Sequence, residues 1–288
     1  MPAKKRRAAA PPPPVTIPAR LPVAKSLAEV IANFDTVVAW AIVEPSGIGY
    51  FATMYRRATI AIDAAIRDGK TFRHPETMAR FAMIFSQRYF DALNAYLDPR
   101  RFERPTHVWQ WHFVGLEYEQ PIVFQHLLTA VDAHVNLDLG IAASRIGRGK
   151  MPDLRADFDM VNTILASQVQ AVLSALGDVS PNIKKLRDKI PDAVEVAAIN
   201  KLLQAFRDLA WKFALALSDE PEDRFQELVD LHDAWAGSLA TFYLYPPGEL
   251  GQCVRWIAEA ESRDVAAIIA RLNEGAETPQ PINPAFLA

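Results

Sequence analysis

The sequence is poor in cysteine and glycine, and each shortage excludes a class of protein. Cys253 is the single cysteine among 288 residues, which excludes an internal disulfide framework and favours a reducing compartment. The 12 glycines form no Gly-rich phosphate loop, and no alternating apolar and polar stretch is bounded by hairpin turns. We therefore expect a cytoplasmic protein that is not an α/β nucleotide-binding protein.

Long apolar runs are also missing from the chain. No uninterrupted run of about 18 to 20 apolar residues occurs, so we expect no membrane-spanning helix. The basic run Lys4–Arg7 is followed by alanines and prolines, whereas a signal peptide has an apolar segment there, which argues against export.

The charges are distributed unevenly between the N-terminal end and the rest of the chain. Residues 1–22 carry five of the 31 basic residues and no acidic one, so the remainder, with all 34 acidic residues, has a net charge of about −8. An acidic body does not favour specific nucleic-acid binding, which requires a basic face. Because residues 1–22 are also rich in proline, we expect a disordered tail there.

Apolar residues and prolines are abundant, and their spacing predicts helices. Half of the residues are hydrophobic, and from Ser26 onward they recur every three or four residues between prolines. The fold class that this indicates is all-α, a single multi-helix bundle-like domain of about ten helices over residues 23–275, with a flexible C-terminal tail over 276–288. The expected helices are 26–43, 47–68, 76–97, 105–118, 121–146, 153–176, 181–190, 192–218, 221–243 and 248–273, the last divided near Ser262.

The predicted helix 121–146 carries ionisable residues on an apolar face. At 100° per residue, His134 and Asp138 fall inside the apolar arc, four residues apart, with His126 toward its edge. A separate narrow polar stripe is formed by Gln125, Thr129, Asp132 and Asn136. Because an unpaired charge is costly to bury, His134 and Asp138 require partners.

A partner for this pair is expected on the predicted helix 76–97. There Arg88 lies in line with apolar residues, and Tyr89 lies beside it. The simplest arrangement is an ion pair between Arg88 and Asp138, with His134 hydrogen-bonded alongside. Such a centre predicts three alternatives, which are a metal site, a metal-free acid–base site and a purely structural polar network.

The metal alternative depends on the spacing of His134 and Asp138. A histidine and a carboxylate at positions i and i+4 can bind one divalent ion, such as zinc or iron. His126 is the candidate third ligand, with His112, Glu117 and Glu119 as alternatives. In the metal-free alternative, His134 acts as an acid or base and Arg88 holds an anionic substrate. In the structural alternative, the same residues only stabilise the bundle.

Several motifs resemble a known family, the bacterial domain-of-unknown-function family 5995. They are Tyr55 with the residues that follow it to Thr59, Phe85 to Tyr89, Trp109, and above all the segment Asp132–Leu139 (DAHVNLDL). The resemblance covers about residues 30–215, and the family motif has asparagine in place of Asp132. It implies a helical fold and a common polar centre with places for Arg88, Tyr89, His134, Asn136 and Asp138.

The leading functional hypothesis is a helical enzyme, with or without a metal, that acts on a small, partly apolar substrate. Its expected catalytic residues are His134, Asp138, Arg88, Tyr89 and Asn136. The alternative is a non-catalytic helical protein that binds a ligand or partner. A further, minor alternative is phosphoester hydrolysis, because residues 111–121 are similar to a segment of zinc-dependent phospholipase C and P1-type nucleases, although their many other ligands are not evident.

Overall fold

The computed structural model describes residues 20–118 and 121–283. These residues contain helices and no strands, which confirms the predicted all-α class. The helices are α1 (Leu27–Val43), α2 (Ile48–Arg67), α3 (Pro75–Leu97), α4 (His107–Gly115), α5 (Val123–Val131), α6 (Leu139–Gly147), α7 (Met151–Val179), α8 (Pro181–Arg187), α9 (Asp192–Ser218), α10 (Glu222–Leu244), α11 (Gly248–Ala258) and α12 (Val265–Asn273), with a π-helical segment η1 (Asp132–Asp138) between α5 and α6.

The helix boundaries follow local signals in the sequence. Ser26 caps α1, since its side chain accepts a hydrogen bond from the backbone N–H of Glu29, and Asp264 caps α12 in the same way. Prolines stand in the first turn of α3, α7 and α8, where their missing N–H is not needed. The expected division near Ser262 is present as the break between α11 and α12.

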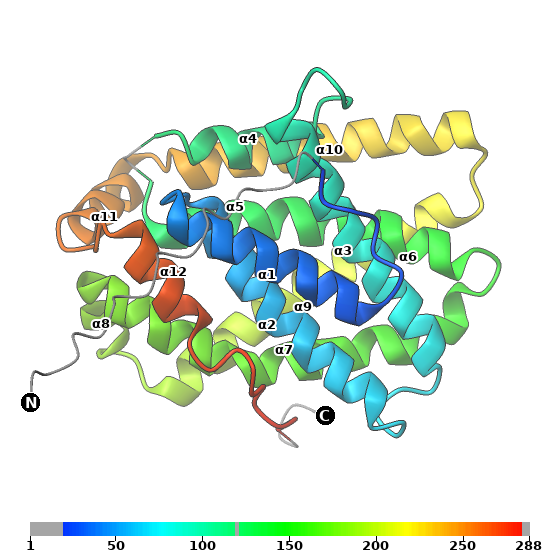
Figure 1. Ribbon diagram of the computed structural model, residues 1–288, viewed down its shortest axis with the longest axis horizontal. Helices are drawn as coiled ribbons and strands as arrows, with labels where there is room; N and C mark the ends of the chain where they lie inside the picture. The colour runs from blue at the N-terminus through cyan, green and yellow to red at the C-terminus, as the bar shows by residue number, and fades with distance from the viewer. Residues whose placement is uncertain (1–19, 119–120, 284–288) are drawn as a thin grey trace, which may run out of the picture.

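The continuous segment α5–η1–α6 runs through the middle of the bundle (Figure 1). It contacts α2, α3, α4, α7, α9 and α10. A close approach to α9 involves Gly140, the second residue of α6, where an added Cβ would lie 2.5 Å from the Phe213 ring. A glycine at this position therefore lets α6 pack closely against the Phe213 ring and the Ala210 carbonyl of α9.

The ends of the predicted domain differ in detail from the expected boundaries. Most of the expected N-terminal tail lies outside the described residues, but Leu21 is fully buried and its N–H donates to Asn94 (2.8 Å). At the other end, the N–H of Gln280 donates to the side chain of Gln168 (3.0 Å), and the N–H of Asn283 donates to Ser167 (2.9 Å). Within the described part of the expected flexible tail, Gln280 and Asn283 are thus bonded to α7.

One helix in the described ranges, α7, is long and apolar enough to cross a membrane by length and composition alone. Within its most apolar 18-residue stretch, 44% is buried inside the protein. A core helix meets the same criterion, so α7 is weak evidence for a membrane span. The expectation that no helix spans a membrane stays a prediction.

Candidate functional site

The π-helical segment η1 contains the motif that stood out in the sequence. In it the backbone N–H of Leu139 donates to the carbonyl of His134, five residues back instead of four. Single π-helical turns inside α-helices are rare and frequent at functional sites. The wider turn also leaves the carbonyl of Asn136 to accept a hydrogen bond from His232 of α10 (2.8 Å).

Asp138 is the centre of a buried hydrogen-bond network. Its side chain is 0% exposed. One carboxylate oxygen, Oδ1, accepts from Arg88 Nε (2.5 Å), and the other, Oδ2, accepts from Trp109 Nε1 (2.8 Å) and His134 Nδ1 (3.2 Å). Burial alone raises the pKa of this carboxyl, but the Arg88 guanidinium and the hydrogen bonds from His134 and Trp109 hold it below its usual value. Asp138 is therefore ionised.

The expected pair of Arg88 and Asp138 is present, although Arg88 is less buried than predicted. Its side chain is 27% exposed because it lines a surface cleft of about 440 Å³, together with Trp109 and Asp138. Trp109 was not predicted as a partner of the carboxylate. It is positioned by α10, where Asp233 accepts hydrogen bonds from the first N–H groups of α4.

His134 is held in one orientation and one tautomer. Its ring stacks on Phe85, with centroids 3.7 Å apart, and the Tyr55 ring meets it edge-on at 4.3 Å. Burial lowers the pKa of His134, more than the neighbouring Asp138 raises it, so the imidazole is neutral. Because an ionised carboxylate only accepts hydrogen bonds, Nδ1 carries the proton, and Nε2 is the free acceptor. No described residue bonds to Nε2.

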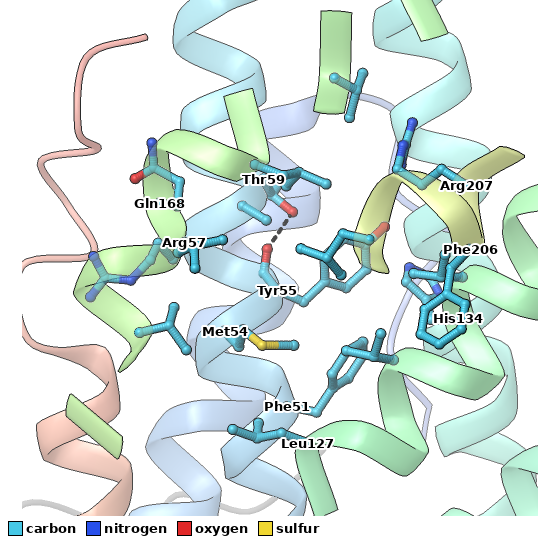
Figure 2. A pocket seen from close by; sticks show the side chains of 18 of the residues that line it. Phe51, Met54, Tyr55, Arg57, Thr59, Leu127, His134, Gln168, Phe206 and Arg207 are labelled. Carbon is cyan, nitrogen blue, oxygen red and sulfur yellow. Dashed lines mark hydrogen bonds between the residues drawn. The ribbon is translucent and has the colours of Figure 1, made fainter. Parts of the chain in front are cut away.

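An apolar cavity of about 290 Å³ lies beside this histidine (Figure 2). Residues of α2, α3, α5, η1, α7 and α9 form its wall, and His134 is among them. The lining residues Phe124 on α5 and Leu202 on α9 are 44% and 50% exposed, so the cavity reaches the surface between these two helices. His134 thus connects the surface cleft, through Asp138 and Arg88, with an interior chamber.

Two other residues of the predicted site lie outside the cavity wall. Tyr89 is buried among the rings of Phe34, Phe51 and Trp109, and its hydroxyl has no hydrogen-bond partner in the described ranges. Asn136 donates to Asp132 (2.6 Å) on the side of η1 that faces α10. Both belong to the surroundings of the Asp138 network and not to the chamber.

The three expected metal ligands are not all brought together. His126 packs beside Tyr50, with ring centroids 5.8 Å apart, and burial lowers its pKa to about 4. Among the described residues, no three or more histidine, cysteine, aspartate or glutamate side chains are placed to hold a metal ion. His134 and Asp138 bond to each other, and His126 does not join them, so these residues do not form the predicted three-ligand site.

One residue that the sequence reasoning missed is Arg207 of α9. It is 3% exposed and lines the cavity. The sequence contains a pattern that indicates a buried arginine there, because Arg207 shares a helical face with Leu203, Ala210 and Ala214. The same pattern singled out Arg88.

Comparison with known proteins gives one match. The model of a family of unknown function, DUF5995, matches residues 27–246, which include the whole of the network and the cavity wall described above. No curated protein matches the chain. No solved structure matches it.

Proposed function

The chain belongs to the family of unknown function DUF5995, and from its geometry we propose that it is an enzyme that binds a largely apolar small molecule and removes a proton from it with His134. The observation that carries this proposal is that His134 lines an apolar cavity and that its Nε2 atom is buried without a hydrogen-bond partner among the described residues. A buried acceptor without a partner is costly, and a ligand that donates a proton there would satisfy it.

The dyad of Asp138 and His134 supports a general-base role. A histidine base must be unprotonated, and hence neutral, before the reaction, and burial keeps His134 neutral. When Nε2 takes the proton, the electron pair stays on the substrate and the imidazolium is stabilised by the Asp138 carboxylate at Nδ1. Arg88 keeps that carboxylate ionised. Return of the same proton to another substrate atom completes an isomerisation without a further reactant.

A non-catalytic ligand-binding protein is the second candidate. It is favoured by the composition of the cavity wall, where Phe, Leu, Ile and Val outnumber the polar residues. In that case His134 only accepts a hydrogen bond from the ligand. We also include in the proposal a cytoplasmic location and the absence of specific nucleic-acid binding, because Cys253 is single and the chain beyond residue 22 is acidic.

The cavity is tested with a neutral apolar fluorophore, N-phenyl-1-naphthylamine. We expect it to bind the wild-type protein with a blue-shifted, stronger emission. Ala58 lies on the cavity wall, so Ala58→Phe fills the chamber and should weaken binding by about tenfold or more. Ala32 on α1 is exposed, and Ala32→Phe should change nothing. Equal affinity for all three proteins would show that the fluorophore binds elsewhere and would remove the support for the cavity.

The state of His134 is tested by nitrogen-15 NMR of the imidazole. At pH 7 we expect a protonated Nδ1 and an unprotonated Nε2, and because the pKa of His134 is lowered by burial, this state should persist as the pH falls below about 6.5, the ordinary histidine value. His134→Gln assigns the signal. A proton on Nε2, or an imidazolium at pH 7, is incompatible with the general-base proposal.

A further inference from the structure

Arg207 is a buried charge without a charged partner. Its Nη2 donates to the carbonyl of Phe158 (3.1 Å), its guanidinium lies 4.4 Å from the centroid of the Phe158 ring, and its Nε has no hydrogen-bond partner. No carboxylate in the described ranges forms an ion pair with it. The nearest acidic residues, Asp159 and Asp208, are both paired with Arg155.

The other two buried arginines of the described ranges are better supplied with hydrogen-bond partners, although Arg57 Nε, like Arg207 Nε, has none there. Arg56 is paired with Asp35 and Glu277. Arg57 donates to the carbonyl oxygens of Leu272 and Glu274 at the end of α12. Arg207 alone of these three faces the cavity with neither a carboxylate nor a set of carbonyl groups around it.

The charge of Arg207 persists in this environment. Burial lowers its pKa to about 10, so the guanidinium is still protonated at pH 7. Removing a charge from water without a counter-charge is strongly unfavourable. Asp159 and Asp208 attract the guanidinium only at longer range, since neither forms an ion pair with it and both are paired with Arg155. Arg207 lines the cavity, so a ligand bound there can supply a direct counter-charge.

A second donor stands beside this cation. The hydroxyl of Tyr55 accepts a hydrogen bond from Ser86 (3.1 Å), which leaves its own proton for a further acceptor. Figure 2 shows Arg207 and His134 on one side of the view and Arg57 and Gln168 on the other, with Tyr55 between them. Arg207 and Tyr55, which interact electrostatically, thus place a cation and a hydroxyl donor on the wall of a largely apolar chamber.

We propose that the natural ligand is an apolar carboxylic acid, whose hydrocarbon body fills the cavity and whose carboxylate binds Arg207. This inference rests on the proposed apolar-ligand cavity and names the class of its ligand. A carboxylate matches the site better than a phosphate because one buried cation neutralises one negative charge, and the guanidinium of Arg57 is already used by backbone carbonyls. Arginine also bonds carboxylates in a bidentate manner.

The test compares cis-parinaric acid with its methyl ester at pH 8, using the full chain. The two fluorescent probes share a hydrocarbon body and differ in charge. We expect the wild-type protein to bind the acid about tenfold more tightly than the ester, as a charge-assisted hydrogen bond allows. Equal affinity for acid and ester would overturn the inference while leaving the cavity in place. Failure of the neutral N-phenyl-1-naphthylamine to bind would instead overturn the proposed function.

The matched variant is Arg207→Met, which keeps the length of the side chain and removes its charge. We expect it to abolish the preference for the acid and to leave ester binding unchanged. Arg80 on α3 is exposed and does not line the cavity, so Arg80→Met should keep the preference. A preference for the acid that survives in Arg207→Met would also overturn the inference.

Thermal unfolding separates a ligand-binding role from a structural one. If Arg207 serves to bind a ligand, Arg207→Met removes an uncompensated buried charge from the ligand-free protein. The variant should then melt at the same temperature as wild type or higher. Parinaric acid should raise the Tm of wild type and not that of Arg207→Met. If Arg207→Met shows a large fall in Tm or does not fold, Arg207→Lys, which keeps the charge, is tested in its place. Loss of the preference for the acid in Arg207→Lys as well would assign Arg207 a structural role and overturn the inference.

Discussion

Arg88→Met is expected to destabilise the protein by about 3–5 kcal/mol, the usual cost of breaking a buried ion pair from one side. The reason is that Asp138, which is 0% exposed, keeps only the hydrogen bonds from Trp109 and His134. Its carboxylate loses the one permanent positive charge beside it. Equilibrium denaturation at pH 7 measures the loss, and the exposed Arg80→Met on the same helix is the control.

Substitution of the other partner, Asp138, should lower the free energy of unfolding by less than substitution of Arg88 does. In Asp138→Asn the amide oxygen can still accept from Trp109 and His134, and Arg88, which is 27% exposed, can turn into the surface cleft. We expect a loss of about 1–2 kcal/mol, and most of the Arg88→Met loss should be recovered in the double variant. If Asp138→Asn is the more damaging change, Arg88 does not compensate the charge.

Periodicity and prolines predicted the helices of this protein well, because both are local properties. Each of the ten expected segments corresponds to observed helix. The π-helical segment η1 was not predicted, since hydrogen bonding to the fifth residue back leaves no mark on residue spacing. A wheel drawn at 100° per residue therefore describes α5 and becomes inaccurate beyond Val131.

The same wheel identified a polar stripe but gave no information about what covers it. Gln125 and Thr129 are buried, because α4 and α10 lie over that face. The Gln125 amide donates to the carbonyl of Leu244 (3.0 Å) at the C-terminal end of α10, and Thr129 bonds to His112 (3.0 Å). Sequence spacing places side chains on a face of a helix, and only packing decides whether that face meets water.

The sequence predicted the part of the candidate site that is formed by two helices. It did not predict the parts that are formed by several helices packing together. The pair of Arg88 and Asp138 followed from two buried charges of opposite sign. The cavity requires α2, α3, α5, α7 and α9 to leave space between them, and no residue pattern encodes an unfilled volume. The position of His126 shows the same limit, because its neighbour Tyr50 belongs to a helix distant in sequence.

Asp132→Asn is expected to stabilise the protein at high pH. Asp132 is buried, its Oδ1 accepts from Asn136 (2.6 Å), and its Oδ2 has no partner in the described ranges. Burial raises its pKa to about 7, against 3.8 for an ordinary aspartate, and the hydrogen bond from Asn136 only partly opposes this. The folded protein therefore favours the neutral carboxyl, and asparagine, which the motif of the resembling family carries here, is neutral at every pH.

The sign of the pH dependence follows from the direction of the shift. A carboxyl whose pKa is raised on folding contributes its stability below the unfolded value of 3.8, and this stability is lost as the pH rises through about 7. Asparagine does not lose it, so the advantage of Asp132→Asn over wild type should be small at pH 4 and grow to about 4 kcal/mol at pH 8, at 1.36 kcal/mol per pKa unit. Denaturation of both proteins across this range measures the difference.

A matched control is Asp230→Asn on α10, which removes a carboxylate from an exposed position and should leave the stability difference from wild type nearly constant between pH 4 and pH 8. The buried histidines do not disturb the comparison, because His112 and His126 are the same in wild type and Asp132→Asn and their effects cancel in the difference. A constant difference for Asp132→Asn as well would mean that Asp132 is ionised and solvated in the folded protein, and that the face of η1 toward α10 is open to water.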